Sequence, residues 1–402
     1  MTTIYLIRHA EAEGNVYRRC HGVYDALLTP KAYQQLPHLA ARFDPVELDA
    51  VYASALYRAR HTAKAIADRK GMQVLIRPAL HEINMGDWED QPWASLPRTY
   101  PAEFACWRSR PWECQVPGGE TVTQAGDRVL AELHRIAAAR DGQTIAVVSH
   151  GSAIRSLLCR VLGLPADKVA DIGWGDNTCV AKLLFAPDGT VQPVYWNDAS
   201  HLPQELSTFA ALGWKDSKGM PSSREMWFRP YDPDSEPDRA LLLSFVREQY
   251  RSAYGSDTKL DETAKLQQAR TAAQAAPRAV SFGMLDDTPV ALIFLDAADR
   301  DEPDVGMVGG YCLADGYRGS ELSAQIIGQS ISVYRSLGRT YLCANVAEHN
   351  ERAQGFYRKF GFDQHGETIN ACSRHFRMYK RIRVDSLEEE RDLFDLSECE
   401  TV

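Results

Sequence analysis

Hydrophobic and polar residues follow two patterns in the first half of the chain, and together they predict its fold. The short apolar runs typical of buried parallel strands are residues 4–7, 50–53 and 144–148. The stretches with a helical period are residues 30–43, 56–70 and 121–140. A closing hairpin is predicted where "TCVAKLLF" and "TVQPVYW" flank "APDG". This alternation predicts an α/β sandwich around a mostly parallel sheet.

The second half of the chain has a pattern of its own, which begins after an irregular stretch. Residues 204–223 hold Gly, Pro, Ser and charged residues without a sustained period, as expected of a linker. Beyond them, strand-like runs such as "TPVALIFLD" alternate with predicted helices at 237–250, 320–337 and 350–360. There is no internal repeat. The sequence therefore predicts two unlike domains and a tail, which are residues 1–203, 224–384 and 385–402.

The charge of the chain is concentrated in its tail. The formal net charge of the 402 residues is −9, and "DSLEEERDLFDLSECETV" supplies −7 of it through eight carboxylates and one arginine. A nearly neutral body argues against a protein that holds nucleic acid through phosphate contacts. We expect the tail to be solvated, with a docked amphipathic helix built on Leu387, Leu393, Phe394 and Leu396 as the alternative.

The sequence carries no membrane or redox signature. No run reaches the roughly 18 apolar residues of a membrane span, and the first residues enter a strand pattern without a signal peptide. The nine cysteines are scattered and form no CxxC pair, so no zinc knuckle or redox motif is indicated and no metal is expected. These features favour reduced thiols in a cytoplasmic protein.

Two predicted strand ends carry the candidate chemistry. Arg8 and His9 follow the run at 4–7, and His150 follows the run at 144–148, directly before a predicted helix. Ligands of open parallel sheets bind beyond the carboxyl ends of the strands, so these side chains should share one crevice. The helix N-terminus adds free N–H groups and partial positive charge. Two histidines and a guanidinium would repel one another unless a dianion lay between them, which predicts a phosphate site.

Other segments offer groups that suit such a site. Arg58 lies in the first turn of the helix after Ser54, where its guanidinium can bind phosphate oxygens. Glu82, in "LHEINMGDWED", is a carboxyl between apolar residues and a candidate proton donor. The turn "VPGGET" presents backbone amides before a helix.

Residues 1–202 resemble the histidine phosphatase superfamily, which has the phosphoglycerate-mutase-like fold. The resemblance rests on "LIRHAEAEGN", "YASALYRARHTA", "LHEINMGDWED", "PGGE", "VVSHG" and "NDASHL". It implies a three-layer α/β/α fold and a reaction without metal or cofactor, in which His9 accepts the phosphoryl group. It also implies that Glu82 protonates the leaving oxygen and then activates water. The implied phosphate ligands are Arg8, Asn15, Arg58, His150 and the Gly151 amide. Ala10 departs from the family, which usually has glycine there.

The choice between phosphatase and mutase rests on one interval. The stretch from Glu82 to Pro117 is short, and "EINMGDWED" resembles small-molecule phosphatases more than mutases, which usually carry a longer insertion over the site. We therefore favour a phosphatase, with mutase-like phosphoryl transfer as the alternative. The predicted substrate rim, with solvated surface as the alternative for each residue, is Arg18, Arg19, His21 and Tyr24. Residues 93–112 are either a lid or an aromatic packing cluster.

Residues 224–383 resemble the GNAT-type N-acetyltransferases through "MVGGYCLADGYRGSELSAQIIG" and "HNERAQGFYRKFGF". The resemblance implies an α+β domain with a mixed sheet that binds acetyl-CoA, with Tyr357 as the proton donor to the departing thiolate. The implied cofactor-binding residues are Arg318, Gly319, Ser320, Ser323 and Asn350. Glu321 departs from the pattern, because the family keeps glycines near the pyrophosphate. The candidate bases for the acceptor amine are Glu348, His349 and Tyr311.

The leading hypothesis is a bifunctional metabolic enzyme that hydrolyses a small phosphorylated metabolite and acylates a small amine, with a shared intermediate as one option. One alternative is a phosphatase whose second domain binds acyl-CoA or mediates assembly without catalysis. Another is a phosphoprotein phosphatase that uses the tail for docking. The sequence leaves the oligomeric state open, a homodimer included.

Overall fold

The structure, a computed structural model, describes residues 1–211, 224–299, 301–369 and 373–399. They form two compact units. The described residues of the first unit are 1–91, 96–211 and 384–399, and those of the second are 92–95 and 224–383 apart from the gaps. Along the chain, the second unit is therefore inserted between two parts of the first. Within the described residues, no helix is long and apolar enough to cross a membrane.

A six-stranded sheet forms the middle layer of the first unit, in the order β3-β2-β4-β1-β5-β6. Its strands are β1 (Thr2–Arg8), β2 (Ala50–Ala53), β3 (Val74–Ile76), β4 (Thr144–Ser149), β5 (Val180–Phe185) and β6 (Val191–Asp198). The first four are parallel, and the last two form an antiparallel hairpin beside β1. The sheet is thus mostly parallel, as predicted.

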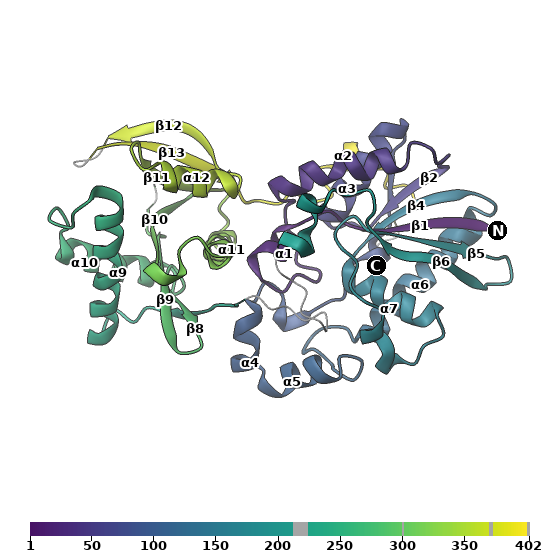
Figure 1. The fold of residues 1–402 in the computed structure, drawn as a ribbon, viewed down its shortest axis with the longest axis horizontal. Helices are drawn as coiled ribbons and strands as arrows, with labels where there is room; N and C mark the ends of the chain where they lie inside the picture. The colour runs from purple at the N-terminus through teal and green to yellow at the C-terminus, as the bar shows by residue number, and fades with distance from the viewer. Residues whose placement is uncertain (212–223, 300, 370–372, 400–402) are drawn as a thin grey trace. The chain divides into compact units, whose positions relative to one another are not determined.

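Helices cover both faces of this sheet. The α-helices of this unit, within the described residues, are α1 (Glu13–Tyr17), α2 (Pro30–Arg42), α3 (Tyr57–Lys70), α4 (Leu96–Thr99), α5 (Pro101–Ser109), α6 (Val122–Ala139), α7 (Gly151–Val161) and α8 (Thr208–Ala211). Figure 1 shows α2 and α3 on one side of the sheet and α6 and α7 on the other. The Thr29 hydroxyl caps α2 by accepting from the Ala32 N–H at 3.2 Å, and Thr121 caps α6 in the same way. The predicted three-layer α/β/α arrangement is confirmed.

The register of β1 and β4 brings the two strand ends to the same level. Arg8 lies opposite Ser149, and the His9 N–H donates to the Ser149 carbonyl oxygen at 3.0 Å. Helix α7 begins at Gly151, directly after His150. The carboxyl ends of both strands and the N-terminus of α7 therefore meet at one edge of the sheet.

The end of the chain packs on the first unit, although the sequence predicts a solvated tail. Asp395 forms an isolated parallel bridge with Leu75, and its backbone exchanges hydrogen bonds with β3 at 2.9 and 3.1 Å. Phe394 is 4% exposed and joins the hydrophobic core beneath α3. The Glu398 carboxylate accepts from Arg77 and Arg140 at 2.6 and 3.1 Å. The segment docks because its apolar side chains meet the core and its carboxylates meet arginines.

The start of the predicted linker also has structure. Residues 204–206 form a 3-10 turn and α8 follows it, both within the first unit. The Thr208 hydroxyl donates to Glu11 at 2.9 Å, and the ring of Phe209 lies 5.6 Å from the Arg8 guanidinium carbon. This stretch thus contributes to the surroundings of Arg8. The rest of the predicted linker, residues 212–223, lies outside the described residues.

The second unit is built on a seven-stranded mixed sheet in the order β12-β13-β11-β10-β9-β8-β7. Its strands are β7 (Trp227–Pro230), β8 (Val280–Leu285), β9 (Thr288–Asp296), β10 (Val305–Leu313), β11 (Tyr341–Ala347), β12 (Asp363–Ile369) and β13 (Arg374–Arg381). Among the described residues of this sheet, β10 and β11 are the only strands that pair in parallel. This confirms the predicted mixed sheet.

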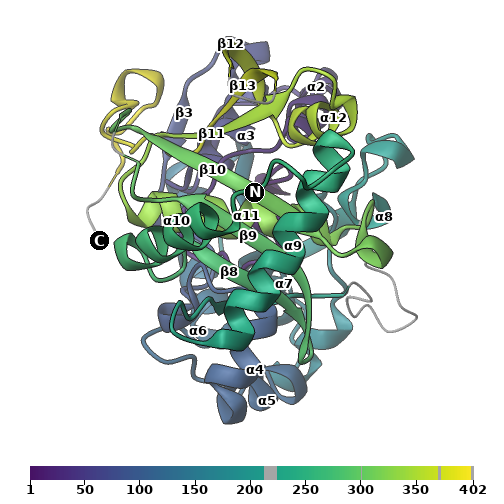
Figure 2. The ribbon, with the colours of Figure 1, turned by 90° about the vertical axis from the view of Figure 1, so that its left-hand side faces the viewer.

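Four helices of the second unit flank that sheet. They are α9 (Glu236–Tyr254), α10 (Glu262–Ala275), α11 (Leu322–Ser336) and α12 (Glu351–Lys359). Figure 2 shows α9 and α10 in front of the sheet and α11 behind it. The hydrophobic pattern does not predict α10 or β12. The only buried side chains of α10 are Ala269 and Ala272, and most of β12 is exposed, so neither has a strong apolar period.

Candidate active sites

His9 lies directly after β1 and is almost fully buried. Its Nδ1 lies 2.7 Å from the carbonyl oxygen of Ala10. A carbonyl oxygen can only accept, so Nδ1 carries the proton and Nε2 keeps the lone pair. Burial, followed by the charges of Arg58 and Arg8, lowers the pKa of His9 well below its ordinary value. At neutral pH the ring is therefore a neutral imidazole with a nucleophilic Nε2.

His150 lies beside His9, with ring centroids 5.2 Å apart and ring planes at 55°. Within the described residues, neither ring nitrogen of His150 has a hydrogen-bond partner, nor does Nε of Arg8, although all three are buried. Buried polar atoms are normally hydrogen-bonded. The oxygens of a bound phosphate would supply these partners. Burial, followed by the charge of Arg58, lowers the pKa of His150 well below its ordinary value.

A second guanidinium and a glycine complete the cationic edge of the site. Arg58, buried in the first turn of α3, donates to the carbonyl oxygens of Tyr24 at 3.1 Å and Gly22 at 2.6 Å. A side chain in place of Gly151 would come within 3.2 Å of Nε of Arg8. The glycine therefore lets the Arg8 guanidinium lie against the N-terminus of α7.

Two asparagines support the loop after β1. Oδ1 of Asn15 accepts from the Ala12 N–H at 2.9 Å and from Nδ2 of Asn177 at 3.3 Å. Nδ2 of Asn177 also donates to the His9 carbonyl oxygen at 2.9 Å. The sequence analysis did not single out Asn177. Its only signal is a polar residue shortly before the strand that pairs with β1.

Glu82 is held at the N-terminus of α7. Its carboxylate accepts from the N–H groups of Ala153 at 2.8 Å and Ser152 at 2.9 Å. Its negative charge also favours the protonated, cationic forms of Arg8 and Arg58. These bonds place a carboxylate in the same site as the two histidines and the two guanidiniums.

The loop that carries Glu82 is fixed by Arg128 and by the predicted turn at 116–121. Arg128 donates to the carbonyl oxygens of Ala79 at 2.7 Å and His81 at 3.0 Å, and to the Glu120 carboxylate at 2.9 Å. Glu120 in turn accepts from the Asn84 N–H at 2.9 Å. The sequence gives no signal for Arg128, because a single arginine in a helix is usually a surface charge.

The four predicted rim residues differ in their surroundings. Arg18 and Arg19 are buried, and Nε of Arg19 donates to Asp90 at 2.7 Å. Nε2 of His21 lies 3.7 Å from the same carboxylate, and its ring lies 5.3 Å from that of Tyr24. The side chain of His21 is 8% exposed, whereas Tyr24 is half-buried. The structure therefore leaves Tyr24 more accessible than the two arginines.

The aromatic residues of the candidate lid pack on one tryptophan. Trp88 is fully buried, and its ring lies 5.9 to 6.1 Å from those of Tyr100, Phe104 and Trp107. This cluster matches the packing alternative for residues 93–112.

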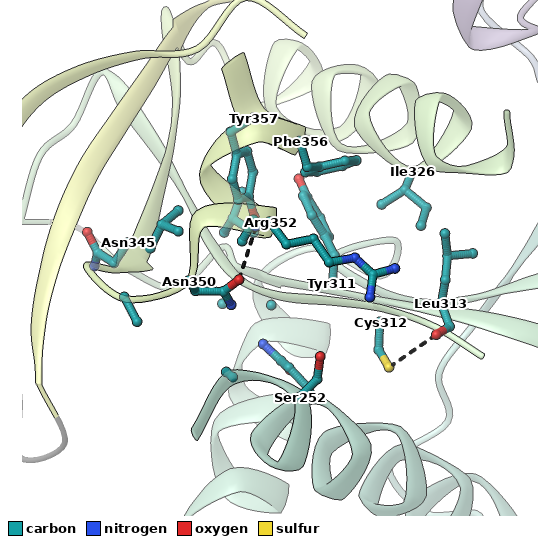
Figure 3. A pocket seen from close by; sticks show the side chains of 18 of the residues that line it. Ser252, Tyr311, Cys312, Leu313, Ile326, Asn345, Asn350, Arg352, Phe356 and Tyr357 are labelled. Carbon is teal, nitrogen blue, oxygen red and sulfur yellow. Dashed lines mark hydrogen bonds between the residues drawn. The ribbon is translucent and has the colours of Figure 1, made fainter. Parts of the chain in front are cut away.

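The second unit holds a cavity of about 730 Å³ (Figure 3). It lies where β10 and β11 separate, because their parallel pairing ends at Val308 and Ala344. All six predicted acetyltransferase residues line it, namely Arg318, Gly319, Ser320, Ser323, Asn350 and Tyr357. Arg352 and Lys359, which the sequence pattern did not single out, line it as well, and Figure 3 shows Arg352 among the lining side chains.

Glu321 does not belong to the lining of this cavity. Its side chain is exposed, whereas its neighbours Ser320 and Ser323 face the cavity. Gly319 has φ +75°, a backbone conformation that favours glycine and turns the chain into α11. The carboxylate that interrupts the family pattern therefore does not enter the cavity.

Two tyrosines, Tyr311 and Tyr357, line the cavity. The rings of Tyr311 and Tyr357 are 6.2 Å apart. Burial raises the pKa of both phenols, and for Tyr357 the neighbouring Tyr311 adds to the effect. Both therefore keep their protons at neutral pH, which suits Tyr357 as a donor and Tyr311 poorly as a base. The other candidate bases, Glu348 and His349, are not among the lining residues.

Comparison with known proteins identifies both units. Residues 4–199 match the model of the histidine phosphatase superfamily, branch 1, and residues 242–362 match that of the acetyltransferase (GNAT) family. Phosphoserine phosphatase 1 of Hydrogenobacter thermophilus is 31% identical over 173 residues, which are 43% of this chain and 82% of the relative. The probable phosphoglycerate mutase GpmB of Erwinia tasmaniensis is 34% identical over 171 residues, 42% of this chain and 78% of the relative.

Among solved structures, Bacillus stearothermophilus YhfR is 29% identical and matches with a TM-score of 0.48, covering 50% of this chain and 99% of its own. This chain covers most of the length of the two curated relatives, whereas each relative covers less than half of this chain. The chain belongs to the histidine phosphatase superfamily and carries a GNAT-family acetyltransferase domain in the same polypeptide.

Proposed function

We propose that the first unit hydrolyses a small phosphate monoester through a phosphohistidine. The observation that carries this proposal is the pair of buried, neutral histidines, in which His9 is fixed through Nδ1 and His150 has both ring nitrogens without a protein partner in the described residues. Nε2 of His9 attacks phosphorus, and the bond from phosphorus to the leaving oxygen breaks. Glu82 gives its proton to that oxygen.

The second half of the reaction regenerates the enzyme. Glu82 takes a proton from water, the water oxygen attacks the phosphorus of phosphohistidine, and the bond from Nε2 to phosphorus breaks. Arg8, Arg58, His150 and the first amides of α7 stabilise the charge on the phosphoryl oxygens in both halves. The name of the Hydrogenobacter relative supports a phosphorylated small metabolite as the substrate.

The names of the relatives also support a mutase as the second candidate. We expect the full-length protein to release inorganic phosphate from phosphoserine or 3-phosphoglycerate faster than it forms 2-phosphoglycerate, because the stretch that follows Glu82 is short. The measurement is phosphate release beside 2-phosphoglycerate formation, with and without 2,3-bisphosphoglycerate. Formation of 2-phosphoglycerate as the main product would establish the mutase instead.

For the second unit we propose acetyl-CoA-dependent acylation of a small amine. The outward position of Glu321 supports it, since the cavity keeps the glycine turn and the α11 N-terminus. Its lining also holds four basic side chains, those of Lys265, Arg318, Arg352 and Lys359. Tyr357 would protonate the thiolate that leaves when the amine takes the acyl group. Fusion of the two units would raise the local concentration of a shared intermediate.

Acetyl-CoA binding to the full-length protein tests this second proposal. We expect a micromolar Kd by calorimetry, unchanged within about twofold in Glu321→Gln, because this carboxylate is exposed. Ser323→Glu places a carboxylate on a lining position and should weaken binding by about tenfold or more, as expected for like charges brought together.

The two variants form a matched pair, one removing and one adding a charge two residues apart. Absence of binding in the folded wild-type protein would contradict the proposal and favour a domain without acyl-CoA chemistry. Tighter binding in Glu321→Gln would show that this carboxylate faces the cofactor after all.

A further inference from the structure

The docked end of the chain contacts the helix that carries a phosphate ligand. Arg60 lies two residues after Arg58 on α3 and is 1% exposed. Its Nε donates to the Glu390 carboxylate at 2.8 Å. Its Nη2 donates to the Asp385 carbonyl oxygen at 2.5 Å and its Nη1 to that of Ala55 at 2.6 Å. Two of the three hydrogen bonds that this buried guanidinium donates within the described residues therefore go to the end of the chain.

Asp25 links Arg60 to the phosphate site. Its carboxylate accepts from the Tyr57 N–H, with both oxygens at 2.9 Å, and thereby ties its loop to the start of α3. One oxygen lies 3.7 Å from Nη1 of Arg58, and the other lies 3.6 Å from Nη1 of Arg60. One carboxylate is therefore shared by two buried guanidiniums.

The position of Arg58 depends on the loop that Asp25 anchors. Within the described residues, both side-chain hydrogen bonds of Arg58 go to this loop, at Gly22 and Tyr24. A shift of Asp25 would consequently move the acceptors that aim the Arg58 guanidinium. A misplacement of about 1 Å in a positioning group can cost about 100-fold in rate.

Glu390 gives the buried Arg60 guanidinium a carboxylate partner in addition to Asp25. A buried guanidinium needs an anionic partner, because removing a charge from water is costly. Within the described residues, Glu390 and Asp25 are the carboxylates that pair with Arg60. If Glu390 lost its charge, Arg60 would turn toward Asp25 and draw it away from Arg58 and the Tyr57 N–H.

Glu390 also fixes the neighbouring ring. Both of its oxygens lie 3.0 Å from Nε2 of His61, whose ring stacks on Tyr57 at a centroid distance of 4.0 Å. On the other side, the His61 ring meets the edge of Phe394 at 5.7 Å. The first turn of α3 is thus held by the end of the chain from two directions.

We infer that Glu390, in the tail that follows the inserted second unit, is a positioning residue for the phosphate ligand Arg58. The inference rests on the proposed phosphatase function. It differs from the docking role considered for the tail, since a tail that only recruits protein substrates would leave small phosphates unaffected.

The test compares three substitutions in the full-length protein, with inorganic phosphate as the calorimetric probe and 4-nitrophenyl phosphate as the substrate. Glu390→Gln should raise the Kd of phosphate and the KM by about fivefold or more. Glu390→Asp should recover part of the loss, because it restores the carboxylate. Glu388→Gln removes the same charge two residues earlier. The Glu388 carboxylate pairs with exposed Arg391 at 3.2 Å, so this substitution should change neither quantity.

A second control separates the positioning of Arg58 by Glu390 from a general weakening of the packing of the tail on the first unit. Glu398→Gln weakens another tail contact, with Arg77 and Arg140, which touches neither Arg60 nor Asp25. All assays are run well below each variant's unfolding temperature. The inference is overturned if folded Glu390→Gln binds phosphate like the wild type, or if Glu398→Gln weakens phosphate binding equally.

Two further outcomes have a defined meaning. If Glu390→Gln does not fold, Glu390→Asp decides alone, and wild-type phosphate affinity together with a wild-type KM in that variant would overturn the inference. If the wild-type protein binds phosphate without hydrolysing the substrate, the proposed function fails while the phosphate affinities still test the role of Glu390.

Discussion

His9→Ala is expected to lower kcat for phosphate release by about 10⁴-fold or more, because the alanine removes the nucleophile and leaves only the charge-stabilising groups. Rapid-quench labelling should show an acid-labile phosphoenzyme in the wild-type protein and none in the variant. Phosphate affinity should persist, since Arg8, Arg58 and His150 remain.

The matched control for this substitution is His38→Ala. His38 is an exposed histidine on α2 of the same unit and should have wild-type rates when replaced. A phosphoenzyme that still formed in His9→Ala would show that another residue is the nucleophile, with His150 the first to examine.

Glu82→Gln should lower kcat by about 10²- to 10⁴-fold on an alkyl phosphate, the range expected for loss of a general acid. The loss should be much smaller for phosphoenzyme formation from 4-nitrophenyl phosphate, because nitrophenolate leaves without a proton. The measurement is the pair of single-turnover rates for the two substrates, with exposed Glu47→Gln as the control.

This substrate pair separates chemistry from structure. The Glu82 carboxylate also accepts from the Ser152 and Ala153 N–H groups, so the substitution disturbs the N-terminus of α7. A purely structural effect would slow both substrates by the same factor. Equal losses would therefore remove Glu82 from the role of proton donor.

The two units differ in how their sites tolerate departures from the family pattern. Ala10, in place of glycine, is fully buried, and its N–H donates to the Thr62 hydroxyl at 2.9 Å. Glu321 is accommodated in a different way, by an exposed position at the start of α11.

Much of the phosphatase site follows from local sequence pattern. The runs before Arg8 and His150 are apolar enough to be buried strands, and parallel strands bring their carboxyl ends together. The register of β1 and β4 places the two strand ends in that arrangement. In the second unit, the motifs around Gly319 and Asn350 likewise lie along one cavity.

Local sequence pattern by itself determined the α/β class of the first unit and the strand ends that supply His9 and His150. The fold of the second unit and the choice of Tyr357 followed from motifs that resemble a known family. Only the tertiary structure decided the partners that hold these groups, such as Arg60 with Glu390, which are 330 positions apart. Local patterns set which elements form. A carboxylate in an acidic tail has no local signal for the buried arginine that it will meet, since that pairing exists only after the sheet, α3 and the end of the chain have packed together.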